Sequence, residues 1–410
     1  MDELEPFESF SFSSNDVHPV YPQALDLALQ ILNHECLMPG ETLQLEYLTS
    51  PSFFEALKFN GDFHQVVYMK TGAGEPMPQK GTKGTKSTKI IDNDRSLRLG
   101  ALGIRSMRKT FSNGHPVQTA YLHHLRIHPT LRGGTSLARG YRAFRKEAEK
   151  LPSGVTYTSI LRENKAAVNI LENASGRGPL PRYTPFCDYL TVIIPLKGFG
   201  RLPLRRRSCR DSFKKYDIRT IEKKDSSEFF SLWREFGERH FGAAFIETPN
   251  EELLPGLHIT DFLGAFHGNR LVGAVGLWDQ TAFKQVKLTG LGGSLEWLWK
   301  AAQLLGPVIG APRLPSIGEN IRFTYFDPWF TVPGHEKALK CLFAEAAGRL
   351  RKSGHWFAAW GTPESHPAAE IREAFFHLIY RSTIYKVAWE GDSCPNLEPG
   401  QIPFANLGFL

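Results

Sequence analysis

Apolar residues recur along this chain with two spacings, one typical of strands and one typical of helices. The segment AYLHHLRI at residues 120–127 is rich in apolar residues and ends just before Pro129, which predicts a strand. A short turn with two glycines follows at residues 132–135. Thr and Ser at its end favour the start of a helix, which we expect at Ser136 or Leu137. The predicted order here is strand, glycine turn and helix.

The segments on either side extend this pattern. Residues 97–127 predict two strands joined at a turn that contains Asn113-Gly114, and Asn-Gly is the strongest short-range signal of a hairpin. Downstream, Val155–Leu161 predicts another strand, and a helix is expected to open near Asn164. The order of hairpin, glycine turn, helix, strand and helix indicates an α/β fold.

The second half of the chain repeats this order. A short alternating strand is predicted from Tyr216, and four apolar residues after it have the spacing of a core-facing helix. These residues are Phe229, Leu232, Trp233 and Phe236. A second hairpin is predicted around residues 267–270. Further on, a strand and a turn are followed by a helix that ends near Leu350. The turn before that helix, at residues 333–335, lacks an Arg-Gly pair.

The glycine turn of the first half is a candidate site for an anion. Glycine adopts positive φ and lets a backbone come close to a ligand, and successive N–H groups at a helix start can bind phosphate. The residues concerned are Arg132, Gly133, Gly134, Thr135 and Ser136. Such a turn also begins many helices that bind nothing. The residues by themselves leave both interpretations open.

The motifs of this region resemble those of the GNAT superfamily of acyl-CoA-dependent N-acyltransferases. That family's central motif is a strand with an apolar-x-apolar-x-Pro end, followed by an Arg-Gly turn with further glycines and a helix. The strand end at residues 125–129 and the pair Arg132-Gly133 match this motif. A later family motif is matched in part, by Asn164, Ala167, Ile170 and Gly176. The resemblance is strongest between residues 97 and 196.

The resemblance implies a co-substrate and a reaction. Members of the family transfer an acyl group from acetyl-CoA or a related acyl-CoA to an amine. By resemblance, the backbone at Leu125, Arg126 and Ile127 binds the pantetheine and the acyl oxygen, and the turn at residues 132–136 binds the pyrophosphate. Asn164 is carried over as a further cofactor-binding residue. No metal is expected.

Two departures from the family pattern bear on activity. Thr135 and Leu137 stand where the family has its later glycines. Leu171 stands at the position of the tyrosine that protonates the leaving thiolate. Tyr183 is therefore our candidate for this acid, and Tyr189 lies on the same segment.

A pair of histidines on the predicted strand is the candidate for proton chemistry. His123 stands where several family members place a catalytic carboxylate, and imidazole accepts protons near neutral pH. His123 is therefore the candidate general base. His124 is expected on the opposite face, because side chains alternate along a strand. Alternatively, both are ordinary residues of a sheet.

Charge and composition limit the class of protein. The chain has 410 residues, 41% of them apolar, and a net charge of +7. Eleven Lys or Arg and three Asp or Glu lie between residues 197 and 224. The net positive charge of this segment is therefore larger than that of the whole chain. A solvated basic linker is one explanation, and guidance of CoA phosphates or an RNA is the alternative.

No membrane span, secretory signal, disulfide framework or metal cluster is expected from the sequence. No window has the apolar length of a membrane helix, and the acidic N-terminus lacks the basic-then-apolar order of a signal peptide. The five cysteines are widely spread and form no CxxC pair. The predicted compartment is the cytoplasm.

These observations combine into one predicted organisation, an α/β protein with two GNAT-like domains in tandem, each a twisted mixed sheet flanked by helices. Residues 1–200 form the domain with the acyl-CoA motif, 201–215 a basic linker, and 216–410 a domain without it. The predicted activity is transfer of an acyl group, first of all acetyl, from acyl-CoA to a primary amine. One alternative is a long-chain acyl or aminoacyl transferase that uses a carrier protein or tRNA. The other is a non-catalytic GNAT fold that binds nucleic acid or protein.

Overall fold

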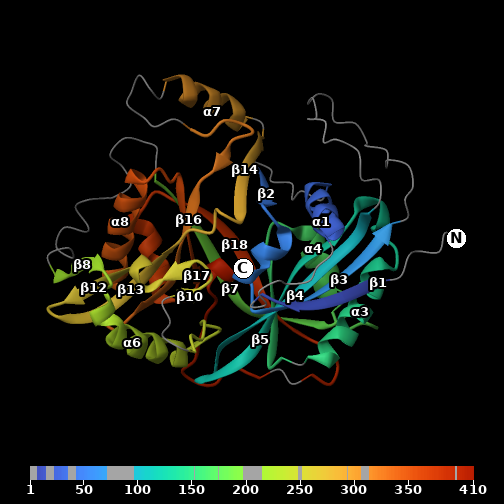
Figure 1. Ribbon diagram of the computed structural model, residues 1–410, viewed down its shortest axis with the longest axis horizontal. Helices are drawn as coiled ribbons and strands as arrows, with labels where there is room; N and C mark the ends of the chain where they lie inside the picture. The colour runs from blue at the N-terminus through green and yellow to red at the C-terminus, as the bar shows by residue number, and fades with distance from the viewer. Residues whose placement is uncertain are drawn as a thin grey trace.

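The computed structural model contains two halves that share one large sheet (Figure 1). It describes residues 7–14, 23–35, 43–71, 97–151, 153–173, 175–196, 215–247, 252–292, 294–305, 314–392 and 395–410. The predicted basic linker, residues 201–215, lies outside the described residues except for Lys215. The division into domains at this linker stays a prediction.

The first half contains seven strands and four α-helices within the described residues. The strands are β1 (Phe7–Ser13), β2 (Leu43–Thr49), β3 (Phe63–Thr71), β4 (Arg98–Ser112), β5 (His115–Ile127), β6 (Val155–Leu161) and β7 (Arg182–Pro195). The helices are α1 (Gln23–Glu35), α2 (Phe53–Ala56), α3 (Ser136–Lys150) and α4 (Lys165–Asn173). Short 3-10 turns lie at Leu57–Phe59 and Pro129–Leu131.

The second half follows the same order with added elements. Its strands are β8 (Asp217–Thr220), β9 (His240–Phe241), β10 (Glu252–Leu254), β11 (Leu257–His258), β12 (Phe262–His267), β13 (Arg270–Trp278), β14 (Lys284–Leu291), β15 (Asn320–Ile321), β16 (Phe323–Thr331), β17 (Phe357–Pro363), β18 (Leu378–Ala388) and β19 (Ile402–Pro403). Its helices are α6 (Ser226–Arg239), α7 (Ser294–Leu305) and α8 (Lys337–Lys352), with 3-10 segments at Lys223–Asp225, Ile259–Asp261, Pro367–Ala374 and Leu407–Phe409.

The local predictions around the glycine turn are confirmed. β4 and β5 form an antiparallel hairpin, and its turn residues Asn113 and Gly114 have φ values of 48° and 80°. Two successive positive φ values match the twist of the strands in a tight hairpin. Helix α3 begins at Ser136, and β6 spans Val155–Leu161, both as the sequence predicts.

The two halves exchange their last long strands in a twelve-stranded sheet. The strand order is β1-β3-β4-β5-β6-β18-β7-β17-β16-β13-β12-β8. β18 of the second half lies between β6 and β7, and β7 of the first half lies between β18 and β17. Each half therefore completes its sheet with a strand from the other half, and the two cannot separate without breaking these ladders.

Helices cover both faces of the first half's sheet. Ile104 of β4 packs in a cluster with Leu29 of α1 and Phe54 of α2. A Cβ on the neighbouring Gly103 would lie 2.4 Å from Phe144 of α3, so α3 covers the opposite face. The site residues of β5, which pairs with β4, therefore lie between two helical layers.

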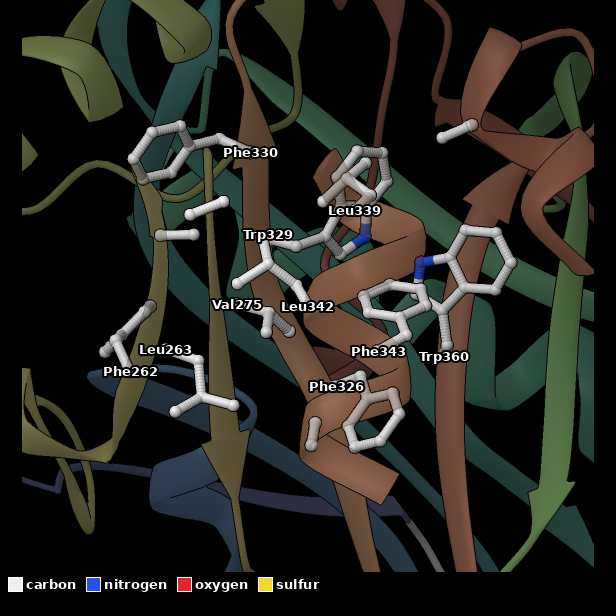
Figure 2. Close-up of a cluster of buried hydrophobic side chains, with 14 of the residues drawn as sticks. Phe262, Leu263, Val275, Phe326, Trp329, Phe330, Leu339, Leu342, Phe343 and Trp360 are labelled. Carbon is white, nitrogen blue, oxygen red and sulfur yellow. The ribbon is translucent and has the colours of Figure 1, made fainter. Parts of the chain in front are cut away.

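The core of the second half lies between α8 and the sheet. Figure 2 shows Leu339, Leu342 and Phe343 of α8 facing the strands that carry Trp329 and Trp360. All five side chains are fully buried. The amphipathic spacing of α8 thus produces a packing face against the sheet.

A smaller three-stranded sheet, β15-β14-β2, joins the halves and carries α7. Trp299 of α7 packs against the cluster on this sheet. Trp297 and Leu304 of the same helix are 79% and 78% exposed. Among the described side chains of α7, one edge therefore contributes to the core.

Candidate functional site

The glycine turn between β5 and α3 is held by contacts within its own segment. The Nδ1 atom of His128 lies 2.8 Å from Thr130 Oγ1 and accepts a hydrogen bond from the Thr130 N–H at 3.4 Å. Arg132 Nε donates to the carbonyl of Ile127 at 3.1 Å. These contacts fold the turn back onto the end of β5, so strand end, turn and helix start lie together.

The turn leaves room for a ligand at its glycines. Gly133 has a φ of +81°, and a Cβ built there meets no atom within 4 Å. A Cβ on Gly134 would come no closer than 3.9 Å to the Leu131 carbonyl oxygen. Thr135, the N-cap residue of α3, makes no side-chain hydrogen bond to the helix. An anion can therefore approach the first-turn amides of α3, the positive end of the helix dipole.

A β-bulge in β5 lies next to this turn. The register between β4 and β5 shifts here, and His124 has a φ of 52°, which is rare outside glycine. The parallel ladder between β5 and β6 ends at Tyr121, although the two strands continue to Ile127 and Leu161. The two strands therefore part at the bulge, on the side of the glycine turn.

The bulge brings His123 and His124 onto one face, so the expectation that His124 points to the opposite face is wrong. Alternation holds only for regular strands, and the extra residue of a bulge breaks it. The two Nδ1 atoms are 2.6 Å apart. His123 stacks on Tyr121, and its Nε2 lies 2.7 Å from Ser106 Oγ on β4. His124 is half-buried and meets Phe53 edge-on.

Both imidazoles are neutral at physiological pH. Burial lowers the pKa of His123 well below its usual value, and the nearby rings and Lys284 act in the same direction. Burial, with Arg126 and Lys284, lowers the pKa of His124 to about 3. Burial and Arg108 lower the pKa of Lys284 to about 7. A neutral imidazole has one donor and one acceptor nitrogen, so each ring can take a proton on one side and give one up on the other.

A narrow cavity of about 50 Å³ lies beside the histidine pair, between the two halves. Ser106 and Tyr121, the two partners of His123, line it. Arg108 also lines it, with its guanidinium 3.4 Å from the centre of the Phe409 ring. The rest of the wall comes from further residues of β4 and β5, from Asn60 and Gly242, and from β6, β7, β18 and residues 404–410. Both halves therefore shape this cavity.

The segment at residues 404–410 is fixed in the centre of the molecule. The Asp327 carboxylate accepts hydrogen bonds from Asn406 Nδ2 at 3.0 Å and from the Gly408 N–H at 2.9 Å. Asn60 Nδ2 donates to the Phe409 carbonyl at 2.8 Å. This segment therefore forms a rigid wall of the cavity.

Tyr183 lies in a buried cluster and not with His123. Its hydroxyl contacts that of Tyr141 on α3, and burial raises the pKa of Tyr183 well above its usual value. The cluster includes Leu171, the position of the family's tyrosine, and Leu122, which precedes His123 on β5. Tyr183 thus keeps its proton and lies in the same cluster as the position of the residue it is predicted to replace.

The other predicted residues gather around the turn. Leu125 packs against the cluster under α3, and Ser136 is buried at the start of that helix. Arg126 and Ile127 are half-buried at the strand end. Asn164 Oδ1 accepts the N–H of Ala167 at 3.2 Å and so caps α4. Contact of these residues with a cofactor stays a prediction.

The corresponding turn of the second half is arranged differently. Gly334 has a φ of +81°, like Gly133. Its N–H donates to Glu336 Oε1 at 2.8 Å. A carboxylate of the chain thus takes an amide that a phosphate would need, in line with the missing Arg-Gly pair in this half.

Three site residues were not predicted from the sequence, namely His64, Ser106 and Arg108. They lie on β3 and β4, and only the register of these strands brings them next to β5. A single polar residue in a predicted strand does not show which residues of neighbouring strands it will lie beside.

Comparison with known proteins identifies the fold. No family model matches the sequence, and no curated protein matches it. Saccharomyces cerevisiae N-myristoyltransferase with bound myristoyl-CoA is similar with a TM-score of 0.53 and 12% identity, over 97% of this chain and 83% of that one. The same enzyme with bound myristoyl-CoA and inhibitors is similar with a TM-score of 0.51 and 13% identity, over 100% of this chain and 88% of that one. A GCN5-related N-acetyltransferase from Anabaena variabilis has a TM-score of 0.42 and 8% identity, over 92% of this chain and 72% of that one.

The chain therefore has a tandem GNAT fold, and the predicted α/β class and architecture are confirmed. Within the described residues, no helix combines the length and apolar character that crossing a membrane requires. The same residues contain no group of three or more His, Cys, Asp or Glu placed to hold a metal ion.

Proposed function

We propose that this protein is an N-acyltransferase that moves an acyl group from acyl-CoA to a primary amine. The observation that carries the proposal is the bulge at His124. It lies where an open glycine turn, a strand end released from its ladder and a buried histidine pair meet. Acyl transfer from a thioester needs a phosphate site, alignment of the thioester and a proton acceptor in one place.

In this proposal, the CoA phosphates bind at the start of α3. Gly133 and Gly134 give the backbone open space there, and Arg132 adds a positive charge. The pantetheine follows the end of β5, where the ladder to β6 has stopped, and the backbone of Leu125 lies along this path. Amide groups of the ligand take the place of a neighbouring strand.

The amine then approaches from the cavity between the halves, and the histidine pair accepts its proton. Both ring nitrogens of His123 are engaged, by His124 and by Ser106. The half-buried His124 is therefore the ring that meets the amine, and His123 passes the proton inward. Tyr183 is proposed to protonate the leaving thiolate, since it carries its proton at neutral pH and lies in the same buried cluster as Leu171.

A long-chain acyl donor is the second candidate. The structural similarity that supports it covers 97% of this chain and belongs to an enzyme solved with myristoyl-CoA. The sequence alone favours acetyl-CoA. Acetyl-CoA and myristoyl-CoA are therefore the two donors to compare.

Release of free CoA from each donor, measured with a panel of primary amines and peptides with free N-termini, tests the proposal. We expect CoA release that depends on the amine and an acylated product detected by mass. Tight binding of acyl-CoA without any product would instead indicate a GNAT fold used only for binding.

A further inference from the structure

A continuous chain of five polar side chains crosses the sheet of the first half, from the bulge in β5 to the end of β1. The Nδ1 atoms of His124 and His123 are 2.6 Å apart, and His123 Nε2 lies 2.7 Å from Ser106 Oγ. Ser106 Oγ lies 2.7 Å from His64 Nδ1, and His64 Nε2 lies 2.6 Å from Ser14 Oγ. Every link is within hydrogen-bond distance.

Only the two ends of this chain reach beyond the core. His123, Ser106 and His64 are 7%, 1% and 0% exposed. His124 is half-buried at the bulge, and Ser14 is half-buried beside the exposed Asp62, whose carbonyl accepts the Ser14 N–H at 2.9 Å. The chain thus connects the proposed acyl-transfer site with the edge of the sheet.

Every member can both donate and accept a hydrogen bond. A neutral imidazole has one N–H and one acceptor nitrogen, and a hydroxyl does both through one oxygen. The chain therefore has two polarities with all four bonds made, either from His124 towards Ser14 or the reverse. Movement of one proton from end to end converts one polarity into the other and leaves no charge in the core.

The surroundings disfavour a proton that stays on any ring. Burial lowers the pKa of His64 to about 3, and Arg108 acts in the same direction. Arg126 and Lys284 do the same for His124. An imidazole that cannot remain charged must pass on a proton that it receives.

We propose that His124, His123, Ser106, His64 and Ser14 form a proton relay that carries the proton of the acylated amine to the surface. This role rests on the proposed function. The amine nitrogen forms the amide C–N bond as the C–S bond of the thioester breaks, and the thiolate is protonated separately. The amine proton enters on His124 Nε2, each member hands one proton to the next, and Ser14 releases one proton to water.

Breaking the relay at His64, far from the reacting atoms, and at Ser106, which also lines the cavity, tests it. His64 lines no part of the cavity, and His64→Gln keeps a donor and an acceptor in place but cannot switch tautomer. Ser106→Ala removes the central hydroxyl. Thr331→Val is the matched control, because it removes another buried hydroxyl, on β16, which donates to the Val272 carbonyl.

The readouts are the single-turnover rate of amide formation, its solvent deuterium isotope effect and the KM for acyl-CoA. We expect both relay variants to lose at least about tenfold in rate, with a changed isotope effect and an unchanged KM. Thr331→Val should match the wild type. Thermal unfolding shows that each variant is folded.

Two results would overturn the proposal, and they differ. In the first, the wild type is active, and His64→Gln and Ser106→Ala keep the rate and isotope effect of Thr331→Val. This result refutes the relay but leaves the proposed function intact. In the second, the wild type binds acyl-CoA but acylates no amine. This result refutes the proposed function, and the relay is refuted with it.

Discussion

The buried pair Tyr141–Tyr183 gives a matched test of whether Tyr183 protonates the thiolate. The two hydroxyls contact each other inside the cluster under α3. Replacing either tyrosine by Phe removes the same hydrogen bond and leaves one buried hydroxyl without its partner. Each variant should therefore lose about 1–3 kcal/mol of unfolding free energy. The double variant should lose less than the sum, because it leaves no orphan hydroxyl.

The two single variants should differ in activity. Tyr183→Phe removes the proposed acid, so kcat should fall by about a hundredfold. Tyr141→Phe keeps that acid and should stay within about threefold of the wild type. Urea unfolding gives the stability of the three variants, and release of CoA gives kcat. Equal losses of kcat in the two single variants would refute the role of Tyr183 as the acid and would show that both tyrosines only stabilise the fold.

Three further predictions follow from the structure. Burial raises the pKa of Asp327 to about 7, so the folded protein binds this proton more tightly than the unfolded chain does. Its stability should fall by up to about 4 kcal/mol as the pH rises from about 4 to about 7. Urea unfolding should show a loss of about 2.5 kcal/mol between pH 5 and pH 8 in the wild type but not in Asp327→Asn; the same dependence of stability on pH in both proteins would contradict it. Phe343→Ala should cost about 3–5 kcal/mol, and the exposed Trp297→Ala less than about 0.5 kcal/mol, both measured by urea unfolding; similar losses would refute the packing described for α8. Arg132→Gln should weaken acyl-CoA binding about tenfold, since a charge-assisted hydrogen bond contributes about 1.5 kcal/mol or more; calorimetry showing unchanged affinity would exclude Arg132 from the site.

The sequence predicted the elements that short-range patterns determine. The hairpin at Asn113-Gly114, helix α3 and strand β6 were all placed correctly. Their signals are turn residues, a helix start and a run of β-forming residues, and each acts within a few positions of the chain. The glycine turn was found for the same reason.

The exchange of β7 and β18 was not predicted. Each strand mixes apolar and β-branched residues with a few charged ones, and nothing in such a run specifies which neighbour it pairs with. Ser382 of β18, for example, lies opposite both Leu161 and Tyr189, which are far from it in the sequence. Strand order in a sheet depends on such long-range pairing.

The histidine site was predicted only in part. His123 was placed correctly on the strand before the turn, and its catalytic role stays a prediction, but strict alternation placed His124 on the wrong face. The bulge depends on how β5 pairs with β4, and the sequence of β5 alone contains no sign of it. Ser106 and His64 join the site for the same reason, through register with neighbouring strands.

Calorimetric titration shows whether the glycine turn binds acyl-CoA. The protein is titrated with acetyl-CoA, myristoyl-CoA and free CoA, beside a Gly134→Val variant. A Cβ at Gly134 comes no closer than 3.9 Å to another atom, the Leu131 carbonyl oxygen, so this variant should fold normally and only obstruct the turn. We expect micromolar binding of an acyl-CoA to the wild type and its loss in the variant. No binding of any of the three ligands, or equal binding to both proteins, would contradict it.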